Sequence, residues 1–230
     1  MKLVIFIAPS KTFNLAFIKG TSSPLFMEKS AVLKSKLLDM SAATLQDKMG
    51  LSPKLAQQVY DYLREPTSGR ASSLFSGVSY KAMELDKLNV KNDKLYIIDA
   101  LYGLVRPHDN ISRYRLDFTM RFLGNLYDYW QNIIAEYLNT HHQDDVLIDL
   151  TSHEFSSLIP SELNVIRVDF AVVNKKISSV LLKQMRGKMT RYLIENNINN
   201  LLELKQIKIE GFSYCPQSSN NNNFIFTRQN

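Results

Sequence analysis

The first stretch that could bind a ligand is APSKT at residues 8–12, which directly follows the apolar run KLVIFIA at residues 2–8. The run predicts a buried strand, and α/β proteins bind ligands in the loops at the carboxyl ends of their strands. Lys11 supplies a cation there, and Ser10 and Thr12 supply hydroxyl groups. The glycine spacing of a phosphate-binding P-loop is absent, so the alternative is an ordinary solvated lysine.

A second basic stretch, at residues 100–122, interleaves four arginines with aromatic residues: Arg106, Arg113, Arg115 and Arg121, with Tyr102, Tyr114 and Phe118. Arginine binds phosphate through two parallel hydrogen bonds, and aromatic rings stack on bases or pack in a core. Asp109 and Asp117 lie in the same stretch. We therefore expect some of these arginines to be held in ion pairs and others to face a ligand.

Four further cations lie on a helix predicted at residues 178–196: Lys183, Arg186, Lys188 and Arg191. They lie outside the apolar stripe of this helix, an arrangement that is also typical of a solvated helix face. Arg191 and Glu195 are four residues apart, which allows an ion pair between them. Gly187 lies among the cations and predicts a close approach by a ligand or by a neighbouring backbone.

Acid–base groups cluster in DLTSHE at residues 149–154, at the end of another predicted strand. Ser152, His153 and Glu154 could serve acid–base catalysis or bind a metal loosely. No second histidine lies at ligand spacing, and the sequence has no nucleophile elbow, zinc motif or dinucleotide fingerprint. We expect neither a resident metal nor a cofactor.

Two short helices, predicted at residues 41–49 and 53–64, are separated by Gly50-Leu51-Ser52. The spacing resembles a helix-hairpin-helix, whose turn amides and second-helix amino end face a DNA phosphate without reading the bases. Lys48 and Lys54 flank the turn with the appropriate charge. Any two short helices joined tightly would give a similar pattern, so the alternative is a structural helix pair.

Strands and helices must position these stretches. Apolar runs predict strands at residues 96–100, 146–150 and 165–173, and a closing antiparallel pair at 207–214 and 224–228. Apolar spacing predicts helices at residues 26–40 and 126–140, and turn residues predict loops at 69–80 and 101–110. Without a linker or an internal repeat, the pattern predicts one compact α/β domain over residues 1–230, a mixed β-sheet flanked by helices.

The charge balance favours acidic partners. The chain has 28 Lys+Arg and 22 Asp+Glu, a net charge of +6, and 45% hydrophobic residues, as in a globular protein. Residues 1–115 contain 17 basic and 10 acidic side chains, and residues 116–230 contain 11 and 12. This excess points to phosphate-bearing polyanions, nucleic acid first, although a protein without charged ligands can also carry it.

The cysteine count and the first residues indicate the compartment. Cys215 is the single cysteine and cannot form an internal disulfide, which fits a reducing environment. The first apolar run is too short for a signal peptide, and no stretch approaches the roughly 18 apolar residues of a membrane helix. We expect a cytoplasmic monomer that does not associate with membranes.

Taken in order, several segments together resemble the YaaA family of bacterial peroxide-stress proteins: APSKT, LYGLVRPHD with YRLDF, DLTSHEF, RGKMTRYLIEN, and EGFSY with the closing SSNNNNFIFTR. The resemblance runs nearly end to end, and the ordered set is specific although each piece alone is weak. It implies one compact mixed α/β domain, a basic cleft, a helix-hairpin-helix element and DNA binding without strong sequence preference. It also implies a role in limiting oxidative damage, linked to lowering free intracellular iron.

Carried over position by position, the resemblance implies a cleft lined by Lys11, Arg106, Arg115, Arg186, Lys188 and Arg191, with Ser152 and Glu154 nearby.

Two classes of function are consistent with this cleft. The first is a DNA-binding protective protein whose cations neutralise phosphates. The second is an enzyme that acts on a small phosphorylated or nucleotide-like substrate in the same cleft, with Ser152, His153 or Glu154 supplying the chemistry.

Overall fold

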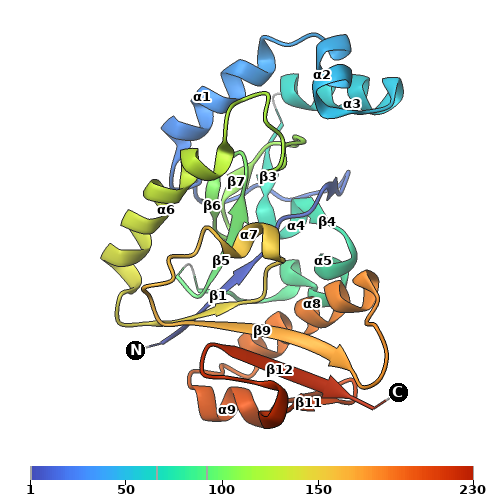
Figure 1. Ribbon diagram of the computed structural model, residues 1–230. Helices are drawn as coiled ribbons and strands as arrows, with labels where there is room; N and C mark the ends of the chain where they lie inside the picture. The colour runs from blue at the N-terminus through green and yellow to red at the C-terminus, as the bar shows by residue number, and fades with distance from the viewer. Residues whose placement is uncertain (1, 66, 92, 230) are drawn as a thin grey trace.

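An eight-stranded sheet organises the protein, and helices pack around it (Figure 1). This computed structural model describes residues 2–65, 67–91 and 93–229. The strands of the sheet are β1 (Leu3–Ile7), β5 (Leu95–Asp99), β6 (Gly103–Val105), β8 (Val146–Asp149), β9 (Val165–Val172), β10 (Lys208–Ile209), β11 (Phe212–Tyr214) and β12 (Asn223–Arg228). Its strand order is β10-β11-β12-β9-β8-β1-β5-β6.

The sheet is mixed, as the sequence predicts. The five central strands β12, β9, β8, β1 and β5 are parallel to one another. The edges are antiparallel, because β6 pairs with β5, and β11 pairs with both β12 and β10. The predicted antiparallel closing pair is confirmed for β11 and β12. Residues 207–214, predicted as one strand, instead contain the two paired strands β10 and β11, and β12 also joins the parallel centre through β9.

Strand β1 lies at the centre of the sheet and determines where the chain changes direction. All five of its residues, LVIFI, are buried. Ile5 lies opposite Leu95 of β5 on one side and Ile148 of β8 on the other. The chain passes from β1 to β5 and later returns to β8 on the opposite side. The carboxyl ends of these strands thus form a topological switch point, the usual ligand-binding edge of an α/β sheet.

The helices are α1 (Met27–Leu38), α2 (Ala42–Met49), α3 (Pro53–Arg64), α4 (Ala71–Leu74), α5 (Val78–Met83), α6 (Leu126–His142), α7 (His153–Ser156), α8 (Ser179–Glu195) and α9 (Leu201–Gln206). Short 3₁₀ turns lie at Leu85–Lys87 and Pro216–Ser218. In α6 the side chain of Trp130 is fully buried, and its Nε1 donates a hydrogen bond to the Ala100 carbonyl at 2.9 Å. Among the described residues, no helix is both long and apolar enough to cross a bilayer.

Two segments predicted as loops contain short ordered elements instead. Residues 69–80 include β3 (Gly69–Arg70), α4, β4 (Phe75–Ser76) and the start of α5, and residues 101–110 include β6 and the first residue of β7 (Asn110–Ile111). Strand β3 pairs with β7, and β4 pairs with β2 (Thr12–Phe13). These elements are two to six residues long, too short to show a period. Pairing or packing with distant parts of the chain defines them.

Helices α5 and α8 pack closely because of one glycine. A Cβ on Gly187 of α8 would lie 2.2 Å from the carbonyl oxygen of Ser79 in α5. The close approach that the sequence predicts at this glycine is therefore made by a neighbouring backbone. Any larger residue would push α5 away from α8.

The helix pair α2 and α3 lies at the end of the molecule remote from β11 and β12 (Figure 1). Gly50 ends α2 in the left-handed conformation, with a φ of 62°. Ser52 begins α3 by accepting a hydrogen bond from Leu55 N at 3.4 Å, and Pro53 occupies the first helical turn. The two helices and their turn are as predicted, whereas a DNA contact by this turn stays a prediction.

Candidate functional site

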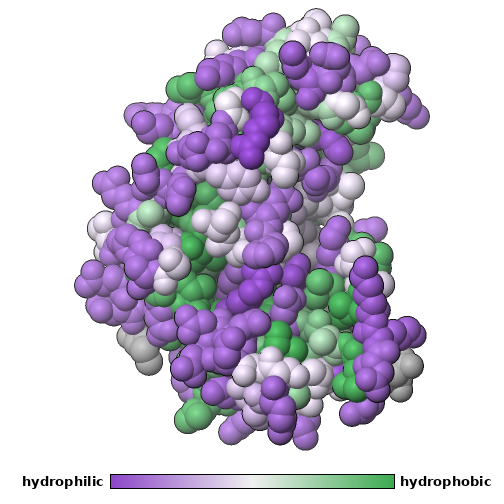
Figure 2. All heavy atoms as spheres, in the orientation of Figure 1, coloured by the Kyte–Doolittle hydropathy of each residue, from purple (hydrophilic) through white to green (hydrophobic). Residues whose placement is uncertain are grey.

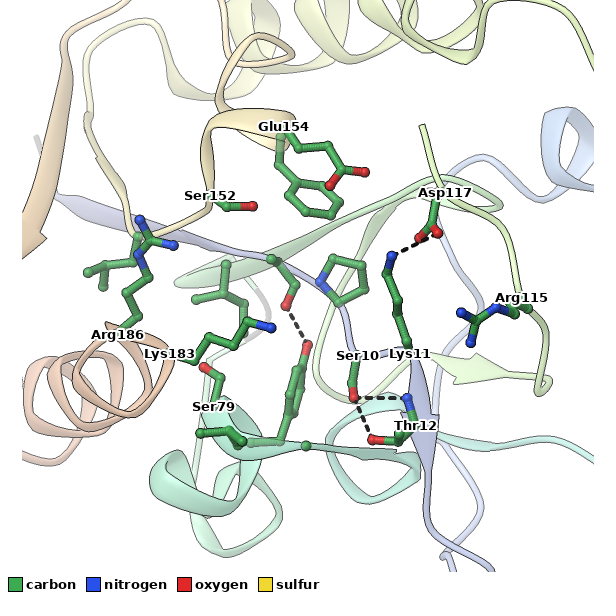
Figure 3. A pocket seen from close by; sticks show the side chains of 18 of the residues that line it. Ser10, Lys11, Thr12, Ser79, Arg115, Asp117, Ser152, Glu154, Lys183 and Arg186 are labelled. Atoms are coloured by element: carbon green, nitrogen blue, oxygen red, sulfur yellow. Dashed lines mark hydrogen bonds and ion pairs between the residues drawn. The ribbon is translucent and has the colours of Figure 1, made fainter. Parts of the chain in front are cut away.

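A cavity of about 450 Å³ opens at the sheet edge where β1 and β8 end (Figure 3). Its walls come from residues 7–12, 77–80 and 114–117, from Leu150, Ser152, Glu154 and Phe155, and from the α8 face that includes position 183. Four cations and two acids line it: Lys11, Arg115, Lys183 and Arg186, with Asp117 and Glu154. The cavity is therefore basic, and it lies where the strand order predicts a ligand site.

The loop after β1 is anchored by its own hydroxyl groups. Ser10 Oγ accepts a hydrogen bond from Thr12 N at 3.1 Å, and both hydroxyls donate to the carbonyl oxygen of Ser76. A Cβ on Gly77 would lie 2.7 Å from Ser10 Oγ, so a larger residue there would displace this hydroxyl. These contacts use the hydroxyl groups to anchor the loop and leave Lys11 as its charged group.

The two acids of the cavity have different environments. Lys11 Nζ lies 2.8 Å from Asp117 Oδ2, so Asp117 has a positive charge beside its carboxylate. Burial raises the pKa of Glu154, the negative charge of Asp117 raises it further, and Lys11 partly opposes the change. Glu154 Oε1 is buried and has no hydrogen-bond partner among the described residues. Glu154 is therefore a carboxyl group with a raised pKa and with one oxygen that has no hydrogen-bond partner in this part of the chain.

Two of the four cations have no ion pair among the residues that the structure describes, Arg115 and Lys183. The Nε of Arg115 is buried and lacks a hydrogen-bond partner there. Lys183 lies on the exposed side of α8, and its side chain points toward the middle of the cavity (Figure 3). Both groups are available to an anionic ligand, which charge-assisted hydrogen bonds would hold.

Arg186 uses only some of its hydrogen-bond donors in contacts with the described residues. Its Nη2 lies 3.2 Å from Asp169 Oδ1, and Asp169 also faces Arg167 at 3.6 Å. Burial lowers the pKa of Arg186, and Asp169 opposes this change. The Nε of Arg186 is buried without a partner in the described part of the chain. Arg167 has a closer acid in Asp149, at 3.1 Å. Arg186 therefore has Asp169 as its ion-pair partner and keeps its Nε–H group for a ligand.

Tyrosines form the floor of the cavity and connect it to a buried acid. Tyr80 donates a hydrogen bond to the Ala8 carbonyl at 3.0 Å. Tyr114 donates to Asp99, which also accepts from the amides of residues 101 and 102 at 2.8 and 2.9 Å. Burial raises the pKa of Asp99 to about 6, although these three donors favour the ionised form. Hydrogen bonds donated by hydroxyl and amide groups therefore hold the tyrosines and Asp99 in place.

The sequence motifs are matched by a known family over nearly the whole chain. The family model described as "Peroxide stress protein YaaA" matches residues 2–218. The chain belongs to this family. Similar proteins, all named UPF0246 protein, occur in Finegoldia magna (30% identical, covering 99% of this chain and 98% of that protein), Francisella tularensis subsp. holarctica (32%, 98% and 100%) and Fusobacterium nucleatum subsp. nucleatum (32%, 89% and 88%).

Eight candidate residues singled out in the sequence, several of them through the YaaA resemblance, line the cavity: Ser10, Lys11, Thr12, Arg115, Ser152, Glu154, Lys183 and Arg186. They come from the loops after β1 and β8, from the arginine-rich stretch and from α8. The rule that ligands bind at strand ends locates the two loops. Only the tertiary structure brings the arginine-rich stretch and α8 to the same place.

Arg106 lies outside the cavity, which corrects the expectation that it lines the cleft. Its Nη2 lies 2.9 Å from Asp109 Oδ1 and donates to the Ser23 carbonyl at 2.7 Å. Asp109 is completely buried, so its carboxylate needs a nearby countercharge. Arg106 provides it and has a structural role.

Lys188 and Arg191 of α8 also lie outside the cavity, contrary to expectation. Lys188 forms an ion pair with Glu210 at 2.5 Å. Arg191 pairs with Glu84 and with Glu195, the latter at 2.8 Å, which confirms the predicted pair within the helix. Ion pairs with Glu210, Glu84 and Glu195 therefore hold these two cations away from the cavity.

The turn with Gly50, Ser52 and Lys54 contributes nothing to the cavity lining. Lys54 is exposed at the start of α3. The outline of the molecule narrows between the α2–α3 end and the region of α8 and β9, and hydrophilic residues predominate on the face shown (Figure 2). The helix pair and the cavity are therefore two separate regions of the YaaA chain.

Some residues of the site gave no clear signal in the sequence. Gly77, Ser79 and Tyr80 lie in a segment interpreted as a loop, and Asp117 was expected to pair with an arginine rather than with Lys11. Within the described ranges, no three His, Cys, Asp or Glu side chains come together as metal ligands. His153, considered for chemistry, is exposed and does not line the cavity.

Proposed function

We propose that this peroxide stress protein binds DNA largely without sequence preference, with its basic cavity as the principal phosphate site. The observation that carries the proposal is that two cavity cations, Arg115 and Lys183, form no ion pair with any described residue. The Nε of Arg186 likewise has no hydrogen-bond partner in the described ranges. Positive side chains that face solvent release counterions when they contact phosphates, and this supplies most sequence-independent affinity for DNA.

The turn between α2 and α3 is the second contact in this proposal. Lys54 is exposed beside the amino end of α3, and Lys48 lies at the end of α2. A helix amino end with nearby lysines binds the DNA backbone because its amides and its dipole favour negative charge. Two separate contacts would hold the backbone at two places without reading the bases.

Binding to DNA offers a physical route to the family's role in peroxide stress. Iron-dependent oxidants form where iron associates with phosphates, and bound basic side chains displace cations from the DNA surface. We propose that the chain limits iron-dependent oxidative damage in this way. In peroxide-treated cells, strand breaks should be fewer with the native protein than with a variant that cannot bind DNA.

A second candidate is an enzyme that acts on a small phosphorylated or nucleotide-like substrate in the same cavity. The specific observation in its favour is Glu154, whose pKa is raised and whose buried Oε1 has no partner among the described residues. A carboxyl group with a raised pKa keeps its proton to a higher pH than an exposed glutamate does, which suits a general acid or base. This candidate requires turnover that Glu154→Gln abolishes, whereas DNA binding alone requires no turnover.

Fluorescence anisotropy with a short labelled duplex over a range of salt concentrations tests the first proposal. The double variant Arg115→Glu/Lys183→Glu should bind at least about tenfold more weakly, with a salt slope reduced by about two. The matched control is Lys91→Glu/Lys208→Glu, which makes the same charge change at exposed lysines that do not line the cavity. Equal losses in both variants, or no binding at low salt, would contradict the proposal.

A further inference from the structure

The shape and polarity of the cavity indicate more than a general phosphate surface. A volume of about 450 Å³ falls in the range of pockets that enclose a small ligand, roughly 300–1,000 Å³. A paired duplex cannot enter a cavity of this size, whereas a single nucleotide can. The part of a DNA molecule that could occupy it is therefore one unit that has left the base stack.

The charges of the cavity lie on opposite sides. Arg186 and Lys183 project from α8 on one side, and Arg115 and Lys11 lie on the other (Figure 3). Between them the lining is largely apolar, with Pro9, Val78, Tyr80, Leu150 and Phe155. A ligand that matches this arrangement has an anionic group at each end and a flat, weakly polar body between them.

Hydrogen-bonding groups without protein partners gather at this site. Five buried side-chain atoms in the described part of the chain lack a partner, and three belong to cavity residues: Arg115 Nε, Arg186 Nε and Glu154 Oε1. A buried polar atom without a partner costs free energy, and a ligand that satisfies it recovers that cost. The two N–H donors suit phosphate oxygens, and the carboxyl group of Glu154 suits the amino edge of a base.

We propose that the cavity receives one unstacked nucleotide, with the phosphates on its two sides held by Arg115 and Arg186 and its base between the apolar walls beside Glu154. A nucleotide within a strand has a phosphate on both its 5′ and its 3′ side, which matches cations on two sides of the cavity. Aromatic and apolar walls accept a base through stacking and burial. As a DNA site, this inference rests on the proposed function, and it adds which part of the nucleic acid enters the cavity.

Calorimetry with free nucleotides tests the chemistry of the site. Deoxycytidine 3′,5′-bisphosphate should bind about tenfold more tightly than deoxycytidine 5′-monophosphate, because the second phosphate gains charge-assisted hydrogen bonds. Arg115→Ala should remove this difference, and Lys208→Ala, at an exposed lysine of β10, should keep it. On the α8 side, Arg186→Lys should also reduce this difference, because a lysine lacks the Nε–H donor. If Arg186→Lys folds poorly, Lys183→Met tests the same side and should reduce the difference as well. Equal affinity for the two nucleotides would overturn the two-phosphate arrangement.

Anisotropy with two duplexes distinguishes a nucleotide in a strand from a free one. A duplex with one extra, unpaired cytosine should bind several-fold more tightly than the fully paired duplex, and Ser152→Phe, which fills the cavity without changing its charge, should remove this preference. Equal binding to both duplexes, without a preference for the bisphosphate, would overturn the inference and leave the DNA-binding proposal intact. Tight bisphosphate binding without any duplex binding would support the cavity as a free-nucleotide site and overturn the DNA proposal.

Discussion

The cavity and the surface around Arg106, Lys188 and Arg191 contain the same kinds of charged residues and use them differently. Outside the cavity, each of these cations has its own acid: Asp109, Glu210, and Glu84 with Glu195. Inside the cavity, Lys11 pairs with Asp117, and Arg186 contacts Asp169 but has an Nε without a hydrogen-bond partner among the described residues. Arg115 and Lys183 have no ion pair in that part of the chain. The difference shows that the supply of nearby acids, rather than the number of cations, determines which positive charges can bind a ligand.

Helix α8 shows this difference within a single element. Arg186 and Lys188 are two residues apart in the sequence, and they face different environments because a helix turns about 100° per residue. The side with Arg186 faces the cavity, and the side with Lys188 meets Glu210 from the turn before β11.

Removing a paired cation should affect stability more than DNA binding. Arg106→Ala leaves the carboxylate of Asp109 buried without its countercharge, and should lower the free energy of unfolding by about 3–5 kcal/mol. Urea unfolding measures the loss. In the double variant Arg106→Ala/Asp109→Asn a large part of the stability should return, since no buried charge remains. A loss below about 1 kcal/mol in the single variant would contradict the structural role of Arg106.

The buried acid under the cavity should make stability depend on pH. Because burial raises the pKa of Asp99 to about 6, the folded protein keeps a proton that the unfolded chain releases near pH 4. The contribution of Asp99 to stability is therefore complete below pH 4 and is lost as the pH rises through 6, by up to about 3 kcal/mol. Asp99→Asn stays neutral, so its unfolding free energy should change less between pH 4 and pH 7. Denaturant curves at several pH values measure this difference.

Removing an unpaired cation should affect DNA binding more than stability. Arg115→Ala should weaken duplex binding about tenfold and lower the salt slope by about one, because one phosphate contact is lost. Lys188→Ala is the matched comparison on the paired side and should change affinity less than twofold, since Glu210 already neutralises that lysine. Anisotropy measures both. Equal losses would show that pairing does not decide which cations bind.

Glu154, one of the two acids of the cavity lining, should make ligand binding weaker as the pH rises. Glu154 holds its proton to a higher pH than an exposed glutamate, because burial and Asp117 raise its pKa. Ionisation adds a negative charge next to the ligand, so affinity for DNA or for the nucleotide bisphosphate should fall a few-fold between pH 5 and pH 8. Glu154→Gln should remove this part of the pH dependence. Calorimetry across this range would contradict the role of Glu154 if the native protein and the variant gave parallel curves.

The long elements were predictable from the sequence and the short ones were not. The apolar run of β1 and the helical spacing of α8 are strong patterns, because most of their positions are decided by burial or by the helix period. Residues 69–80 show no such pattern, and their short strands and helices form only against distant segments such as β2 and β7. The wall of the cavity that includes Gly77 and Tyr80 was missed for this reason.

The family, the mixed α/β class and the two loops that line the cavity after β1 and β8 could be predicted from the sequence alone, because these features depend on local patterns and on the order of strands along the chain. Which cations are paired could be learned only from the folded structure. Glu84 and Arg191, or Lys11 and Asp117, are far apart in the sequence, and folding brings each pair into contact. The sequence shows which residues are charged, whereas the fold determines whether an oppositely charged side chain lies next to each of them.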